Sequence, residues 1–161
     1  MDFDSGLTEC LPRLRRFAHA LSRDASDADD LTQSTIERAL IARRQWQPGT
    51  RLDSWLYRIM RNLWIDTARS RTRKARLEAP PEAGSNVGVD ARPGMEASID
   101  LARVMAAMDR LPDEQREVVA LILVEGFGYR ETAETLGLPI GTVSSRLVRG
   151  RMALLEMVGE R

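Results

Sequence analysis

The amino-acid sequence predicts an all-α protein made of two small helical domains joined by a flexible linker. Apolar residues recur at spacings of three and four along most of the chain, the period of an amphipathic helix. No segment shows the sustained apolar–polar alternation typical of a strand. Residues 77–96 are rich in Pro, Gly and acidic residues, a composition that buries too little apolar surface to order a segment. We therefore expect domains over residues 1–76 and 97–161.

Three helices are expected in the first domain. An apolar stripe runs along residues 7–21, and Pro12 within it indicates a start near residue 10 or a local irregularity. Ser26 with Asp29 resembles a capping box, so a second helix is expected to open there. The break "QPGT" at residues 47–50 precedes a third helix over residues 53–73, whose core face consists of Leu56, Ile59, Met60 and Leu63.

The second domain is expected to end in a helix-turn-helix. Before it, one helix stops at Pro112 and the most hydrophobic helix of the chain follows. Ala133 is small where two helices must cross closely, and Gly137 can adopt the left-handed conformation of a tight turn. The final helix is expected to pack through a stripe at one-turn intervals: Val143, Leu147, Gly150 and Leu154.

The opposite face of that final helix carries hydroxyl and arginine side chains. Such a face suits the DNA major groove, because arginine pairs bidentately with guanine and hydroxyls bond phosphates or bases. An ordinary helical hairpin with a solvated basic face is the alternative, which the excess of arginine disfavours. The outward residues are Thr142, Ser144, Ser145, Arg146, Val148, Arg149 and Arg151.

Charges are segregated along a chain whose 24 basic and 24 acidic residues give no net charge. Residues 24–37 hold five acids and no base, whereas residues 51–76 hold eight bases and two acids. Blocks of opposite sign indicate two different partners, one of them anionic, although solvated helix faces are the alternative for each block. The basic helix also carries Trp55, Tyr57 and Trp64, which favours salt-dependent binding to nucleic acid with stacking on unpaired bases. Trp55 is nevertheless expected in the core.

Composition argues against several other classes of protein. Cys10 and His19 are single residues of their kind, so an intramolecular disulfide, a zinc site or a Cys–His nucleophile pair is not expected, and neither is any cofactor. No apolar run reaches the roughly 20 residues of a membrane span, and no signal-peptide pattern opens the chain. We expect a cytoplasmic protein without membrane insertion.

Three stretches resemble bacterial extracytoplasmic-function (ECF) sigma factors, the minimal branch of the sigma-70 family: "DADDLTQSTIERAL", "SWLYRIMRNLWIDTAR" and "LPDEQREVVALILVEGFGYRETAETLGLPIGTVSSRLVRGR". Their order, the linker and the chain length agree with that family. The resemblance implies region 2 and region 4 domains that bind core RNA polymerase at the β′ clamp and the β flap and direct it to particular promoters. It implies no catalytic site, and it implies control by an anti-sigma factor in a stress response.

The resemblance also assigns roles to individual positions. Core polymerase binding falls on Asp29, Asp30, Leu31, Gln33 and Ile36. Recognition and melting of the −10 region falls on the loop over residues 44–54 and on Arg58, Arg61, Asn62 and Arg69. Contacts with −35 bases fall on Ser144, Ser145 and Arg149, and phosphate contacts on Thr142, Arg146 and Arg151. The chain departs from the family pattern at Ile36, Leu40, Leu52 and Trp64, which leaves the −10 preference open.

Two other functions remain as alternatives. A stand-alone helix-turn-helix transcription regulator explains the final helices, but it explains neither the acidic second helix nor the basic third one. An enzyme requires a nucleophile, a base or a metal cluster, which one histidine and one cysteine do not supply.

Overall fold

The computed structural model of the 161-residue chain describes residues 2–77 and 98–159. Within those two ranges all regular elements are helical and no strand occurs, which confirms the expected all-α fold class. The linker expected over residues 77–96 lies outside the described residues except for Leu77, which ends a helix. No helix within the described ranges combines the length and apolar character needed to cross a membrane.

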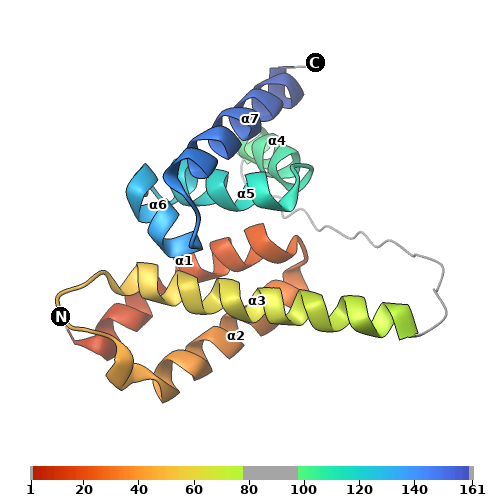
Figure 1. The fold of residues 1–161 in the computed structure, drawn as a ribbon. Helices are drawn as coiled ribbons and strands as arrows, with labels where there is room; N and C mark the ends of the chain where they lie inside the picture. Colours follow the sequence, from red (N-terminus) through yellow and green to blue (C-terminus); the bar gives the residue numbers. More distant parts are fainter. Residues whose placement is uncertain (1, 78–97, 160–161) are drawn as a thin grey trace.

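Helices from the two halves of the chain form two layers (Figure 1). The N-terminal helices are α1 (Phe3–Ser22), α2 (Ala25–Ile41) and α3 (Leu52–Leu77), with the short 3-10 helix η1 (Arg43–Gln45) following α2. The C-terminal helices are α4 (Ser98–Asp109), α5 (Asp113–Val119), α6 (Tyr129–Leu136) and α7 (Ile140–Gly159), with the π-helical turn η2 (Ala120–Val124) following α5. They lie over α1 and the first half of α3. The second half of α3, residues 65–77, projects past the other helices and is called its outer half below.

The first helix starts earlier than expected. α1 begins at Phe3, and the carboxylate of Asp2 caps it by accepting a hydrogen bond from the backbone of the first turn. Of the two alternatives for Pro12, the start near residue 10 is therefore wrong, and the proline lies inside the helix. A proline there removes one backbone hydrogen bond and crowds the preceding turn. Burial of Leu14 and Phe17, both almost completely inaccessible, keeps the helix continuous across it.

The second helix also begins before the expected position. Asp24 is the N-cap of α2, and its carboxylate accepts a hydrogen bond from the backbone N–H of Asp27 at 2.9 Å. The opening expected at Ser26 is thus two residues late. A carboxylate at the cap satisfies a free N–H group and also interacts favourably with the positive end of the helix dipole.

The core of the N-terminal helices forms where α3 crosses α1. Leu56, Tyr57 and Met60 are fully buried, whereas Ile59 and Leu63 of the expected core face are half-buried. Trp55 is half-buried as well and packs edge-on against Phe3, with ring centroids 6.0 Å apart. The face of α3 that was expected to be apolar therefore does point toward the core.

α6 and α7 form the expected helix-turn-helix. Gly137 ends α6 in the left-handed conformation (φ 70°, ψ 38°), and its N–H donates to the carbonyl of Ala133. Val143 and Leu147 are buried and hold α7 against the C-terminal helices. Gly150 allows the closest approach, since a Cβ added there would lie 2.7 Å from Cγ2 of Val119 in α5.

Candidate nucleic-acid interface

The outward face of α7 presents most of the residues expected to read DNA. Ser145, Arg149 and Arg151 are exposed, and within the described ranges their side chains form no hydrogen bond or ion pair. Thr142 and Ser144 are half-buried. The six expected −35 residues thus lie along about three turns of one helix.

Arg146 differs from the other arginines of this face. Its guanidinium lies 3.4 Å from the carboxylate of Glu114 in α5, and its side chain is half-buried. The contact holds the side chain against its own helical layer. An arginine fixed in this way is better placed to grip a phosphate at the edge of the groove than to enter it.

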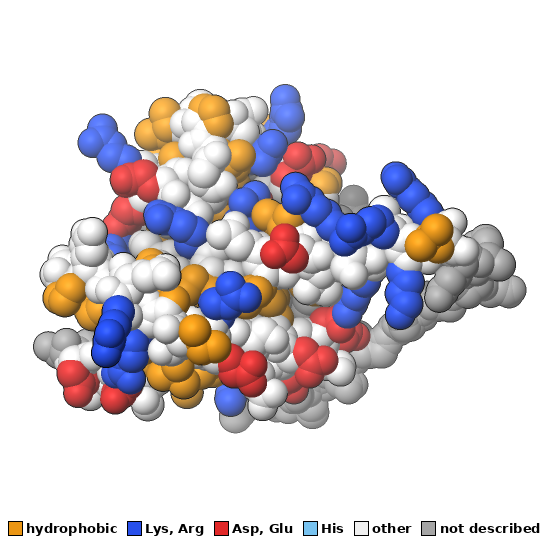
Figure 2. Space-filling model, turned by 60° about the horizontal axis from the view of Figure 1, so that its bottom comes forward, with side chains coloured by type: hydrophobic (Ala, Val, Ile, Leu, Met, Phe, Trp, Pro, Cys, Tyr) orange, Lys and Arg blue, Asp and Glu red, His pale blue; other side chains and the backbone are white. Residues whose placement is uncertain are grey.

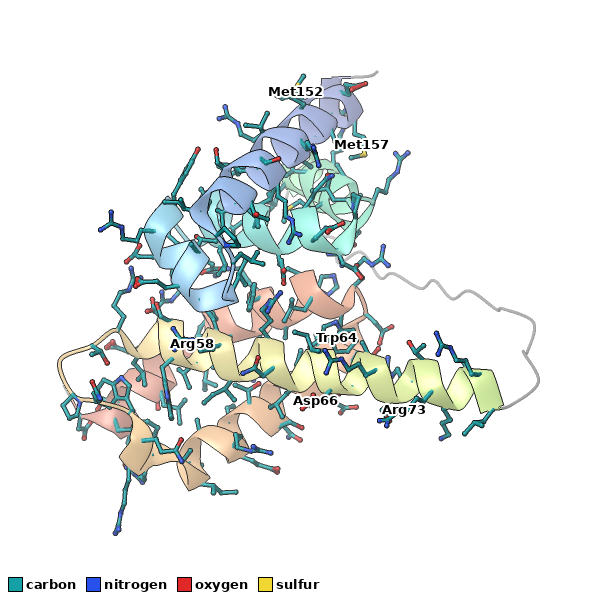
Figure 3. All side chains as sticks on the ribbon, in the orientation of Figure 1. Arg58, Trp64, Asp66, Arg73, Met152 and Met157 are labelled. Atoms are coloured by element: carbon teal, nitrogen blue, oxygen red, sulfur yellow. The ribbon has the colours of Figure 1, made fainter. Side chains whose placement is uncertain are left out.

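Basic side chains gather along α3. Figure 2 shows Lys and Arg side chains over the outer part of this helix, with acidic side chains over the neighbouring α2. Arg69 and Asn62 are exposed and have no side-chain partner among the described residues. In Figure 3, Arg58 lies near the start of α3, under the C-terminal helices, while Arg73 lies on the outer half of the helix.

Two of the four expected −10 residues contact the C-terminal helices. Arg58 donates to the backbone carbonyl of Glu134 at 3.3 Å. Arg61 forms a two-pronged ion pair with Glu117, with Nε and Nη2 at 2.9 and 3.1 Å from the two carboxylate oxygens. The structure therefore brings Arg61 to an internal surface. Arg58 stays exposed although its guanidinium contacts α6, and Asn62 and Arg69 lie on an outer surface.

A buried carboxylate organises the start of α3. Asp53 accepts hydrogen bonds from Arg13 and Arg51 at 2.9 and 2.8 Å. Burial alone would raise the pKa of Asp53, but the two guanidinium groups hold that pKa below its usual value. Arg51 also pairs with Glu131 of α6, and its guanidinium lies 4.4 Å from the centre of the Phe127 ring. Arg51, in the loop expected at the −10 region, is thus fixed from both layers.

A groove of about 910 Å³ separates the outer half of α3 from α5. Its two long walls have opposite charge. The α3 wall is mostly basic and the α5 wall is mostly acidic. The charged residues are Arg61, Asp66, Arg69, Arg73 and Arg76 of α3 and Asp113, Glu114, Arg116 and Glu117 of α5, and Arg146 of α7 also lines the groove. A polyanion entering this groove would meet the arginines only in competition with the carboxylates of α5.

The acidic helix α2 presents part of the expected polymerase-binding set. Asp29, Asp30 and Gln33 are exposed, and Ile36 is half-buried. Leu31 is only 5 % exposed and packs in the core, so it supports this face from beneath.

Asp27, to which the sequence assigned no role of its own, links α2 to the basic helix α3. It forms a two-pronged ion pair with Arg71 of α3, with nitrogen–oxygen distances of 3.0 and 2.8 Å, and this pair lowers the pKa of Asp27. Arg71 also lies 5.5 Å from the centre of the Trp64 ring.

Reasoning from the sequence missed the acidic partners of the basic helix. Glu117 and Glu131 stand 56 and 80 residues from the arginines that they contact. The sequence around these two glutamates does not indicate that they pair with distant arginines, because each lies in an ordinary charged turn of a helix. The excess of arginine over residues 51–76 was interpreted as a sign of nucleic-acid binding and not of acidic partners within the chain.

The described residues offer little for metal or thiol chemistry. Across residues 2–77 and 98–159 no three His, Cys, Asp or Glu side chains are grouped to hold a metal ion. Cys10 is buried, and burial raises the pKa of its thiol, which lowers the reactive thiolate fraction.

Comparison with known protein families matches both layers. The Sigma-70 region 2 model matches residues 7–74, and the Sigma-70 region 4 model matches residues 101–154. Each match contains the expected helices: α2 and most of α3 in the first, α6 and most of α7 in the second.

Individual relatives agree with these matches. The ECF RNA polymerase sigma factor EcfG of Rhodopseudomonas palustris is 41 % identical over 92 % of this chain and 80 % of its own length. The ECF sigma factor SigE of Mycolicibacterium smegmatis is 40 % identical over 92 % of this chain, which spans 58 % of that relative.

Solved structures show the same fold. The sigma factor RpoE of Bartonella quintana, crystallised with the anti-sigma factor NepR, aligns with a TM-score of 0.86 and 34 % identity over 99 % of both chains. CnrH, in complex with the cytosolic domain of CnrY, aligns with a TM-score of 0.64 and 25 % identity over 95 % of this chain and 87 % of CnrH. The helices, both family matches and these relatives lead to one conclusion: the chain belongs to the ECF sigma factors of the sigma-70 family.

Proposed function

We propose that this sigma factor binds core RNA polymerase through α2 and promoter DNA through α3 and α7. The observation that carries the proposal is the separation of these surfaces by charge and by helix. Exposed carboxylates lie on α2, whereas exposed arginines lie on the outer half of α3 and on the outer face of α7. The acidic surface of α2 and the basic surfaces of α3 and α7 therefore suit partners of opposite charge.

The α2 surface is proposed to bind the β′ clamp. Asp29, Asp30 and Gln33 supply exposed polar contacts for a basic helix of the partner, and Ile36 adds an apolar one. Leu31 acts by packing beneath them. The β flap is the proposed partner of the C-terminal helices.

The DNA contacts are proposed to divide between the two layers. Arg58, Arg61, Asn62 and Arg69 of α3, with the loop over residues 44–54, serve the −10 region. On α7, Ser144, Ser145 and Arg149 read −35 bases, and Thr142, Arg146 and Arg151 hold phosphates. Two separate domains, over residues 1–76 and 97–161, make these contacts at the spacing that polymerase sets. Because both domains bind the same DNA at once, their two weak affinities multiply.

Regulation by an anti-sigma factor is part of the proposal. RpoE and CnrH, the structural relatives described above, were both solved with proteins bound to them, NepR and the cytosolic domain of CnrY. We propose that this chain is held inactive in the same manner until a stress signal releases it, that it acts in the cytoplasm, and that it has no catalytic site of its own.

In vitro transcription tests the proposal. Core polymerase is supplied with a promoter library, with and without the purified protein, and transcripts are sequenced. The expected result is a set of start sites that depend on the protein and share −35 and −10 elements. If no template is transcribed, the proposal fails. A stand-alone regulator would instead bind duplex DNA tightly as a dimer without core polymerase.

A further inference from the structure

We propose that Phe3, in the first turn of α1, is a positioning residue for −10 recognition. It holds the −10 loop, residues 44–54, in the place where an unpaired base can be received. The inference rests on the −10 role proposed above for that loop, and it names a residue outside the loop that sets the loop's geometry.

The tip of the −10 loop, residues 47–50, is exposed and closes on itself. The backbone N–H and the hydroxyl of Thr50 both donate to the carbonyl of Gln47, at 3.1 and 2.6 Å. Gly49 supplies the left-handed conformation of this turn, with φ 95°. The tip therefore fixes its own shape, but its position relative to α3 depends on the two stems that carry it.

α1 anchors the stem that leads into α3. Asp53 is 7 % exposed and accepts a hydrogen bond from Arg13 of α1 at 2.9 Å. Arg51 is fixed on the same carboxylate, at 2.8 Å. Because these bonds join charged groups around a buried carboxylate, this end of the loop is held firmly against α1.

Phe3 anchors the other stem. Trp46 packs against the Phe3 ring, with the centroids 5.9 Å apart and the planes tilted by 56°. Trp55 of α3 packs edge-on against the same ring. Phe3, itself 8 % exposed, thus joins a side chain before the loop tip to one after it. Figure 1 shows the start of α1 beside the connection between α2 and α3.

The first turn of α1 contacts the short helix η1 as well. The Arg43 guanidinium lies 4.9 Å from the centre of the Phe3 ring and 3.0 Å from the carboxylate of Asp4. Both charged side chains are largely exposed, so their ion pair adds little. The Phe3 ring, which contacts Arg43 and Trp46 together, is therefore the main link between α1 and this stem.

The indole N–H of Trp46 makes the packed position of the stem depend on Phe3. Nε1 of Trp46 is buried and has no hydrogen-bond partner among the described residues. A buried donor without a partner costs free energy, which Trp46 would regain by turning its N–H toward water. Packing against Phe3 opposes that movement. Without the Phe3 ring, we expect Trp46 to swing outward and to carry the stem with it.

A displaced stem should affect −10 recognition and leave −35 recognition unchanged. Hydrogen bonds that read a base require donors and acceptors at fixed distances, so a small shift of the loop weakens them. The proposed −35 residues lie on α7, in the other helical layer. The ratio between the two kinds of base discrimination therefore reports on the position of the loop.

Phe3→Leu removes the ring and keeps an apolar side chain. Phe17→Leu is the matched control, because it makes the same replacement in the same helix. Phe17 is 1 % exposed and packs against Tyr57, with ring centroids 4.9 Å apart. A loss of stability without a shift of the loop is therefore represented by the control.

Two measurements are made on the full chain. Acrylamide quenching of tryptophan fluorescence reports the exposure of Trp46, and the signal lost in Trp46→Phe identifies its share. In vitro transcription with core polymerase uses templates that each carry one substituted −10 or −35 base. For each template, the fall in transcription relative to the unsubstituted promoter is the penalty for that base.

Wild-type protein should show a penalty of about tenfold for a substituted base in either element. In Phe3→Leu, quenching of Trp46 should increase and the −10 penalty should fall toward one, while the −35 penalty stays at its wild-type value. Phe17→Leu should keep both penalties. A merely structural role of Phe3 would lower the total transcript and leave both penalties unchanged. Unchanged quenching, an unchanged −10 penalty, or an equal loss in Phe17→Leu each overturns the inference.

Phe3→Met covers the case in which Phe3→Leu does not fold. Methionine fills most of the same space with a flexible chain, so it preserves burial without supplying a rigid ring for Trp46. The same loss of −10 discrimination is expected, and a wild-type penalty in this variant would refute the role of the ring. Failure of the proposed function looks different: core polymerase would start no transcript with wild-type protein, however Trp46 responds to Phe3→Leu.

Discussion

Replacing Gly150 by alanine tests how closely α7, the second helix of the helix-turn-helix, approaches α5. A Cβ at this position would lie 2.7 Å from Cγ2 of Val119 and 3.6 Å from Cβ of Gln115. The first distance is shorter than real Cβ contacts, and Val119 is β-branched and 1 % exposed, so its side chain has little freedom to rotate away. The strain must therefore move α7 away from α5.

Two opposing terms set the size of the effect. Overpacking of a core by one methyl group costs about 1–3 kcal/mol. Alanine is favoured over glycine inside a helix by about 1 kcal/mol. The net expectation is a loss of stability of up to about 2 kcal/mol, and each kcal/mol lowers the melting temperature by about 2–4 °C in a chain of this size.

Gly141, in the same helix, supplies the control. No atom lies within 4 Å of a Cβ built there, so Gly141→Ala should gain up to about 1 kcal/mol from helix propensity alone. Differential scanning calorimetry of both variants compares them directly. If Gly150→Ala melts at or above the temperature of Gly141→Ala, the close approach of the two helices does not exist.

Three further predictions concern charged side chains. Arg149→Ala should cost about 1–3 kcal/mol of promoter affinity and relax the −35 base preference, as measured by binding to a −35 library; an equal loss on every sequence would mean a phosphate contact only. Reversing Asp29 and Asp30 to lysine should abolish co-purification with β′ and leave thermal unfolding unchanged, because both side chains are exposed; retained co-purification would refute the assignment. Asp109, 3.9 Å from Nε2 of His19, raises the pKa of that histidine above its usual 6.5 against the opposing effect of burial. A raised pKa means that this contribution to stability is complete below pH 6.5 and is lost as pH rises through the folded value. An NMR titration should show the His19 pKa fall in Asp109→Asn, and an unchanged value would contradict the pairing.

The sequence predicted helices well where turn residues and the spacing of apolar residues determine them. The helix-turn-helix followed from Gly137, because a left-handed turn strongly favours a residue without a side chain, and from the one-turn spacing of Val143 and Leu147. The helix starts were less accurate. Pro12 argued for a late start of α1, and the burial of the surrounding apolar residues outweighed it.

Contacts between the two layers were not predictable from pattern. The sequence indicated two helical modules, each with its own DNA-facing arginines, and gave no sign that Arg61 would meet Glu117 or that Arg51 would meet Glu131. These pairs depend on the relative placement of helices far apart in the chain. Charge excess in a segment indicates that a partner is needed, but it does not distinguish a nucleic acid from a carboxylate of the same chain.

The π-helical turn η2 is a place where the chain can change length at little cost to its direction. The backbone N–H of Glu125 bonds to the carbonyl of Ala120, five residues earlier, so this turn holds one residue more than an α-helical turn. Both kinds of turn complete about one revolution, so loss of a single codon here would restore ordinary winding with little rotation of the chain downstream. Glu125 would keep its direction toward Tyr57. A single in-frame deletion should therefore be tolerated better in this turn than inside α5, where it would rotate the following residues by about 100°.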